Sequence, residues 1–163
     1  MKKTLLATAL AAAMPYVAMA NDIGTVTVDG TEQSVNMENS QVSIGESANT
    51  VAINGLSKHG ILVNVQDNEA TVLGSDITVT SDTTETIRAS NGGVVKLGGS
   101  NTKTVDLTGP DTGLVALTGG QINVQTEKLT ISGGDYGIWV QNNTETATAP
   151  EGASSLTINA KDT

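Results

Sequence analysis

The feature that most constrains this chain is a short apolar–polar–apolar unit that recurs between glycines. It is plainest in GGVVKLGGSNTKTVDLTGPDTGLVALTGG, which runs from Gly92 to Gly120. Alternation with a period of two predicts a β-strand in which the outer two side chains face one way and the middle one faces the other. The glycine, asparagine, aspartate and serine residues between the units are typical of tight turns. The sequence therefore predicts many short strands joined by turns.

The unit occurs throughout the chain after residue 20, and no stretch there has a sustained helical period. The units are Val26–Val28, Val42–Ile44, Val51–Ile53, Val63–Val65, Ile77–Val79, Val95–Leu97, Val105–Leu107, Val115–Leu117, Ile122–Val124, Leu129–Ile131, Ile138–Val140 and Leu156–Ile158. We expect the flanking residues of each unit to face the core. The middle residues are expected to face outward: Thr27, Ser43, Ala52, Asn64, Thr78, Lys96, Asp106, Ala116, Asn123, Thr130, Trp139 and Thr157.

The spacing of the units favours a coil over a hairpin. Between residues 95 and 140 the units recur about every seven to ten residues, which suits the sides of a coil of roughly 20 to 30 residues. The segment 111–114 is echoed at 135–138, and more weakly at 58–61. Such coils become stable by stacking, so we expect an all-β parallel β-helix, a solenoid. The alternative, a β-sandwich, needs longer strands and two-residue hairpin turns, for which Asn54-Gly55 and Asn91-Gly92 are candidates.

The N-terminal residues predict export. Lys2 and Lys3 precede the apolar run LLATALAAAM, and a small-x-small cleavage pattern ends at Ala20. A membrane-spanning helix needs about 20 apolar residues, so this shorter run is better read as a secretory signal peptide, residues 1–20. Residues 21–163 are then one β-helical domain. The chain is therefore predicted to be exported and cleaved after Ala20.

Charge and cysteine content exclude several classes of function. The chain has 17 acidic and 8 basic residues, for a net charge of −9. Because nucleic-acid binders need a basic surface, we expect no nucleic-acid partner and no direct membrane insertion after signal removal. Without cysteine there is no disulfide framework and no thiolate metal site.

No catalytic constellation is evident. His59 is the single histidine, and Arg88 is the single arginine. His59 stands beside Gly60 in a predicted turn, and no G-x-S-x-G element is present. The serious enzyme alternative is a β-helix that cleaves polysaccharides, which needs carboxylates or a cation and a base gathered on one face. We therefore predict no catalytic residues and no enzyme activity.

Two weaker candidates remain. Asp67, Asp76, Asp82 and Asp111 could gather a calcium ion, but no ligand spacing supports one, so we predict no cofactor and no metal site. Trp139 is the one large apolar residue in the outward set, and it could contact a sugar ring or a partner protein. Coverage by the segment 142–154, or a one-residue shift in register, would remove it from the surface.

The export signal, the GGVVKLGGS and GLVALTGGQINV runs, the acidic Thr-, Asn- and Gly-rich composition and the lack of cysteine resemble the N-terminal part of a bacterial autotransporter (type V secretion) passenger. The resemblance implies a right-handed, pectin-lyase-like β-helix that is incomplete at its C-terminus. It also implies an outer-membrane translocator barrel as a partner, and a location at the bacterial cell surface, in the outer membrane or in the extracellular medium.

The function expected from this resemblance is that of a surface or secreted structural or adhesin-like segment without catalytic activity. Its partner would be a host or cell-surface glycan or protein. The alternative is a secreted polysaccharide lyase or hydrolase.

Overall fold

The computed structural model describes residues 21–35, 41–56, 58–142 and 153–162, so the predicted signal peptide lies outside the described residues. The described part is all-β. Its strands are β1 (Asp22–Ile23), β2 (Thr25–Val28), β3 (Thr31–Gln33), β4 (Gln41–Ile44), β5 (Thr50–Gly55), β6 (Ile61–Val63), β7 (Glu69–Val72), β8 (Asp76–Ser81), β9 (Ile87–Ser90), β10 (Val94–Gly98), β11 (Thr104–Thr108), β12 (Thr112–Leu117), β13 (Gln121–Ser132), β14 (Tyr136–Gln141) and β15 (Ser155–Asp162).

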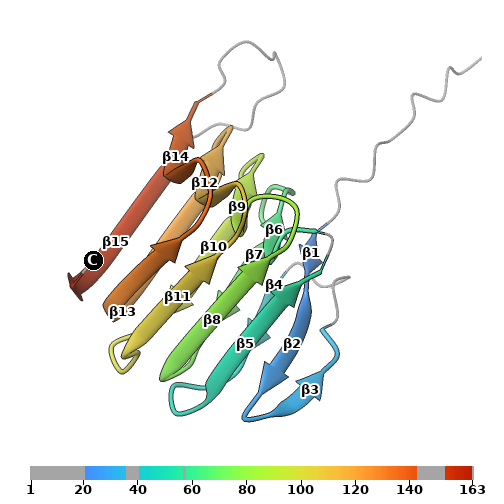
Figure 1. Ribbon diagram of the computed structural model, residues 1–163. Helices are drawn as coiled ribbons and strands as arrows, with labels where there is room; N and C mark the ends of the chain where they lie inside the picture. Colours follow the sequence, from blue (N-terminus) through green and yellow to red (C-terminus); the bar gives the residue numbers. More distant parts are fainter. Residues whose placement is uncertain (1–20, 36–40, 57, 143–152, 163) are drawn as a thin grey trace, which may run out of the picture.

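The strands stack as successive turns of a solenoid of about four coils, which confirms the predicted fold class (Figure 1). Each coil has three sides, for example β7, β8 and β9, and the next coil repeats them as β10, β11 and β12. Equivalent sides pair in parallel: Ile61 lies beside Ile87, Ile87 beside Leu114, and Leu114 beside Ile138. Parallel pairing between strands so far apart in sequence excludes the sandwich alternative, which is built from antiparallel strands.

The three sides form two sheets. The small sheet has the order β1-β6-β9-β12-β14, and the large sheet has the order β3-β2-β5-β8-β11-β13-β10-β7-β4, with β15 added on β13. The large sheet contains two sides of each coil because the long strand β13 runs along both sides and joins them. Its first part pairs with β10 and its last part with β11. Figure 1 shows these strands side by side along the solenoid axis.

The core is a set of columns, a column being the residues that occupy one position in successive coils. Val51, Ile77 and Val105 form one column and are completely buried. β5 has alternating exposed and buried residues along its whole length, as a period of two requires. Each coil alone has too few apolar side chains for a core, so burial depends on the neighbouring coils.

In β12 the predicted register is wrong by one residue. We expected Val115 and Leu117 to face inward and Ala116 outward. Ala116 instead joins the core cluster with Leu114, whereas Val115 pairs with Arg88 on the outer face. The stretch from Leu114 to Leu117 is apolar throughout, so both registers satisfy the alternation and the sequence does not separate them.

The last coil departs from the prediction in another way. Ile138 and Val140 occupy the same columns as Leu114 and Ala116, as expected of inward residues. They are nevertheless 46% and 45% exposed, because β14 lies at the edge of the small sheet.

The first strands are antiparallel, which the sequence reading did not anticipate. β2 pairs antiparallel with β5, and β3 pairs antiparallel with β2 through a tight turn at Asp29 and Gly30. Both turn residues have positive φ, 48° and 76°, as a two-residue hairpin requires. All three residues of β3 are exposed, and they give this end of the solenoid a polar edge strand.

Candidate functional site

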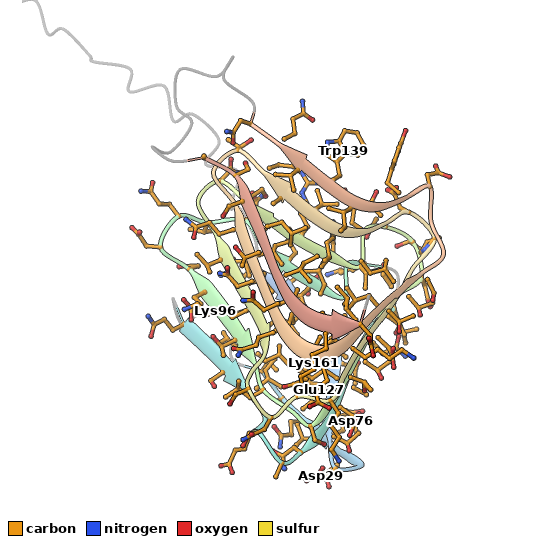
Figure 2. All side chains as sticks on the ribbon, turned by 90° about the vertical axis from the view of Figure 1, so that its left-hand side faces the viewer. Asp29, Asp76, Lys96, Glu127, Trp139 and Lys161 are labelled. Carbon is orange, nitrogen blue, oxygen red and sulfur yellow. The ribbon has the colours of Figure 1, made fainter. Side chains whose placement is uncertain are left out.

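The outer face of the small sheet carries Arg88 and Trp139, two of the residues that sequence reasoning had singled out. The parallel register aligns Leu62, Arg88, Val115 and Trp139 in one outward column. Their chain neighbours Ile61, Ile87 and Leu114 face the core, so this column faces away from it. Trp139 is 44% exposed, and Figure 2 shows its ring on the outer side of the ribbon. The predicted outward direction of Trp139 is therefore confirmed.

Trp139 is one half of an aromatic pair. Its ring centroid lies 5.5 Å from that of Tyr136 at an interplanar angle of 71°, an edge-to-face contact. The indole Nε1 of Trp139 donates a hydrogen bond to Oε1 of Gln141 at 3.2 Å, which fixes the ring from the same face of the strand. The suggested cover, segment 142–154, falls almost wholly on residues 143–152, which lie outside the described residues.

Val115 is the neighbour of Trp139 in the outward column. It is only 2% exposed although it faces outward, because the column places it between the larger side chains of Arg88 and Trp139. Trp139 is therefore exposed beside a buried apolar neighbour. We call Tyr136 and Trp139 together the aromatic shelf.

A second group lies on the corner that leads into the small sheet. The imidazole Nε2 of His59 is 2.9 Å from Oε2 of Glu85, and Nη1 of Arg88 is 3.3 Å from Oε1 of the same carboxylate. The register explains the meeting: Ile61 pairs with Ile87, so two residues earlier His59 falls beside Glu85. The single histidine and the single arginine are thus brought to one carboxylate, which sequence reasoning had not identified.

The chemistry of this group is set by Glu85. Contact with the His59 imidazole, aided by Arg88, lowers the pKa of Glu85 to about 2 against the opposing effect of partial burial. Such a carboxylate stays ionised at neutral pH, so it has no proton to donate and is a weak general base. The carboxylate of Glu85 forms an ion pair with Arg88 of its own coil and contacts His59 of the preceding coil.

The aspartates considered as calcium ligands do not converge. Asp76 instead accepts hydrogen bonds from the hydroxyls of Thr104 and Ser75, both at 2.9 Å, and these bonds lower its pKa. Across residues 21–35, 41–56, 58–142 and 153–162, no three histidine, aspartate or glutamate side chains are grouped as metal ligands would be.

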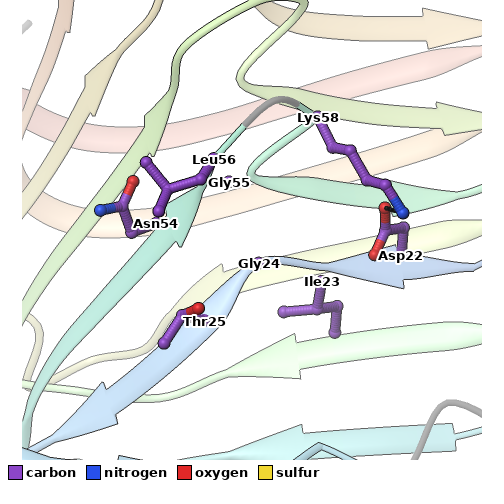
Figure 3. A pocket seen from close by; sticks show the side chains of 8 residues that line it. All are labelled: Asp22, Ile23, Gly24, Thr25, Asn54, Gly55, Leu56 and Lys58. Atoms are coloured by element: carbon purple, nitrogen blue, oxygen red, sulfur yellow. Dashed lines mark ion pairs between the residues drawn. The ribbon is translucent and has the colours of Figure 1, made fainter.

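An open pocket of about 350 Å³ lies where β1 and β2 meet the end of β5 (Figure 3). Lys58 and Asp22 form an ion pair of 3.2 Å at its rim, and Leu56 is 60% exposed beside it. The lining residues are Asp22, Ile23, Gly24, Thr25, Asn54, Gly55, Leu56 and Lys58. Three of these side chains are charged or amide groups, and the pair Lys58–Asp22 is already satisfied, so the pocket offers little to hold a ligand.

Comparison with known proteins does not place the chain in a family. No family model matches it, and searches of curated proteins and of solved structures find no significant match. Nowhere in the described part of the chain is there a helix of the length and apolar character that crossing a bilayer requires.

The low pKa of Glu85 gives a first prediction. The ordinary glutamate pKa is 4.5 and that of Glu85 is about 2, so folding favours its ionised form. Its contribution to stability is present above pH 4.5 and is lost as the pH falls from 4.5 towards 2. We expect Glu85→Gln to lower the free energy of unfolding by about 1–2 kcal/mol at pH 7 and to have little effect near pH 2. Urea unfolding at several pH values measures the difference.

Glu127→Gln is the matched control for Glu85→Gln. Its carboxylate pairs with Lys161 at 2.7 Å on the fully exposed surface, and such pairs contribute little. An identical acid dependence in Glu85→Gln and the unmodified chain would contradict the assignment of that dependence to Glu85.

Proposed function

We propose that this chain is an exported, non-catalytic segment of the bacterial cell surface or the secreted fraction, which acts as an adhesin or a structural spacer. The observation that carries the proposal is the regularity of its outer face. One polar column of the large sheet runs through five successive strands and consists of Ser43, Thr71, Lys96, Asn123 and Thr157. A surface of repeated polar side chains suits binding through many weak contacts.

The partners that fit this surface are host or cell-surface glycans and proteins. The export signal in residues 1–20 and the stacked coils are also what the autotransporter resemblance implies, with a translocator barrel as the export partner.

A polysaccharide-active enzyme is the second candidate, and one observation favours it. His59, Glu85 and Arg88 are the acid–base groups and the cation that such an enzyme would gather, and they meet on one corner. The pKa of Glu85 near 2 counts against a proton-transfer role for this carboxylate. A structural role for the Glu85 carboxylate therefore remains the preferred interpretation.

Adhesion is tested with the exported chain purified after signal removal. Labelled protein is applied to immobilised glycans, extracellular-matrix proteins and whole cells, and we expect saturable retention on at least one of these surfaces. Weak contacts of this kind are strengthened by presenting several copies, so beads coated with the protein should bind more tightly than the free chain. Absence of retention in both forms would contradict the adhesive function and leave only a structural role.

The same preparation tests catalysis. We expect no product from pectin, alginate, chitin or peptide substrates, with or without calcium. Product that disappears in His59→Ala or Arg88→Ala would overturn the non-catalytic proposal in favour of the enzyme.

A further inference from the structure

The aromatic shelf is the one place on the described surface where two large aromatic rings are exposed together. Tyr136 is 57% exposed and Trp139 is 44% exposed, and both lie on β14. Neither side chain belongs to the core cluster. Burial of an aromatic side chain is strongly favourable, and exposed apolar patches mark interaction sites. Two exposed rings side by side therefore indicate a surface that binds a partner.

The shape of the shelf restricts the partner. The rings meet at 71°, so the indole forms a floor and the phenol stands at an angle to it. The hydrogen bond to Gln141 holds the indole, and Val115 is its buried neighbour in the outward column. An open step of this kind fits one flat, rigid ring laid against the indole, such as the apolar C–H face of a pyranose.

The charge around the shelf restricts the partner further. The chain has a net charge of −9, and Asp135 precedes Tyr136 directly as an exposed acid. The positive side chain in the Trp139 column is Arg88, whose guanidinium is engaged by Glu85. Anionic sugars would be repelled there, whereas the hydroxyl groups of a neutral sugar can donate hydrogen bonds to carboxylate and amide oxygens.

From these observations we infer that the aromatic shelf is a binding site for one ring of a neutral saccharide. The ring stacks on the Trp139 indole beside Tyr136, and Asp135 and Gln141 are placed to accept bonds from its hydroxyls. This inference rests on the proposed adhesive function and names the class of ligand for it. A single ring on an open surface binds weakly, so useful adhesion requires many copies of the chain or of the sugar.

The chain supplies its own reporter, because Trp139 is its single tryptophan. Its fluorescence is followed while cellohexaose, chitohexaose, maltohexaose or mannohexaose is added, with oligogalacturonate as the anionic comparison. We expect a saturable change in intensity and a shift to shorter wavelength with at least one neutral oligosaccharide, because the stacked sugar excludes water from the indole. No change with any neutral probe, or a stronger response to oligogalacturonate, would overturn the inference.

Variants then test the site by calorimetry or affinity electrophoresis with the responding sugar. Trp139→Ala should weaken binding about ten-fold or more, as loss of a central aromatic contact does, and Trp139→Phe should restore part of it. Leu56→Ala removes an apolar side chain that is more exposed than Trp139, at the opposite end of the solenoid, and should leave binding unchanged. Unaltered binding in Trp139→Ala would overturn the shelf as the site.

The same variant separates this inference from the adhesive function. Adhesion to cells or glycans that persists at full strength in Trp139→Ala would overturn the shelf while leaving the adhesive function in place. Adhesion that falls in Trp139→Ala and recovers in Trp139→Phe would support both.

Discussion

Replacing Leu114 by alanine is expected to lower the free energy of unfolding by about 2–5 kcal/mol, whereas Ile138→Ala is expected to cost less than about 1 kcal/mol. The two residues are neighbours in one inward column. Leu114 is completely buried, with coils on both sides, and its loss leaves a cavity that rigid backbone ladders cannot close. Ile138 is 46% exposed, so its alanine variant loses little buried surface. Urea denaturation of both variants, monitored by circular dichroism, measures the difference.

The comparison also tests the corrected register of β12. Ala116→Asp would introduce an unpaired charge into the core cluster and should prevent local folding. Asn123→Asp, at a half-buried outward position, should be nearly silent. Equal losses from Leu114→Ala and Ile138→Ala would contradict the difference in burial, and a harmless Ala116→Asp would contradict the register.

The sequence predicted the fold class because the unit that repeats is also the unit that stacks. Alternation identified buried pairs such as Ile77 with Val79 and Val105 with Leu107, all completely buried. The spacing of segments 111–114 and 135–138 matched the pairing of Leu114 with Ile138. The chain has two repeats, the alternation of apolar and polar side chains within each strand and the regular length of the coils. A sequence with both repeats is typical of a solenoid.

The places where prediction failed have separate causes. In β12 the apolar run of Leu114, Val115 and Ala116 satisfied either register, and packing against Ile87 and Ala89 decided it. At the N-terminal end, Val26 and Val28 alternate like any other unit, and alternation carries no information on strand direction. The Asp29-Gly30 pair was the available signal, because these residue types favour the two-residue hairpin.

The candidate site was half predictable. Trp139 could be placed on the outer face from its own strand, because the flanking residues are apolar. Its contact with Tyr136 depends on the path of the chain into β14, which alternation does not describe. Glu85 was missed because its meeting with His59 follows from coil length: they lie 26 residues apart, as do Ile61 and Ile87. An offset of 26 residues predicts which side chains meet only after the coils have been aligned with one another.

The second large loss of stability is expected from substitution of Gly120, which lies at a corner between two sides of a coil. This glycine leads from the turn after β12 into β13, and its amide donates a hydrogen bond to the carbonyl of Leu117 at 2.9 Å. A Cβ atom at this position would overlap the backbone carbonyl of Ala89 in the preceding coil. Gly93 faces the carbonyl of Val63 in the same way, so the close approach recurs from coil to coil.

Gly120→Ala is therefore expected to lower the free energy of unfolding by about 3 kcal/mol or more, at the upper end of overpacking costs. The obstructing atoms are backbone atoms of β9, which is paired on both sides in the small sheet, so they cannot move without breaking the ladder. Gly30→Ala is the matched control. Its φ of 76° is strained for alanine, but no atom lies within 4 Å of the added Cβ. That strain alone should cost about 1–2 kcal/mol. Urea denaturation measures the free energy of unfolding of both variants. Equal losses would mean that backbone strain, and not contact between coils, explains the glycine at position 120. The close approach of Gly120 to Ala89 of the preceding coil would then be wrong.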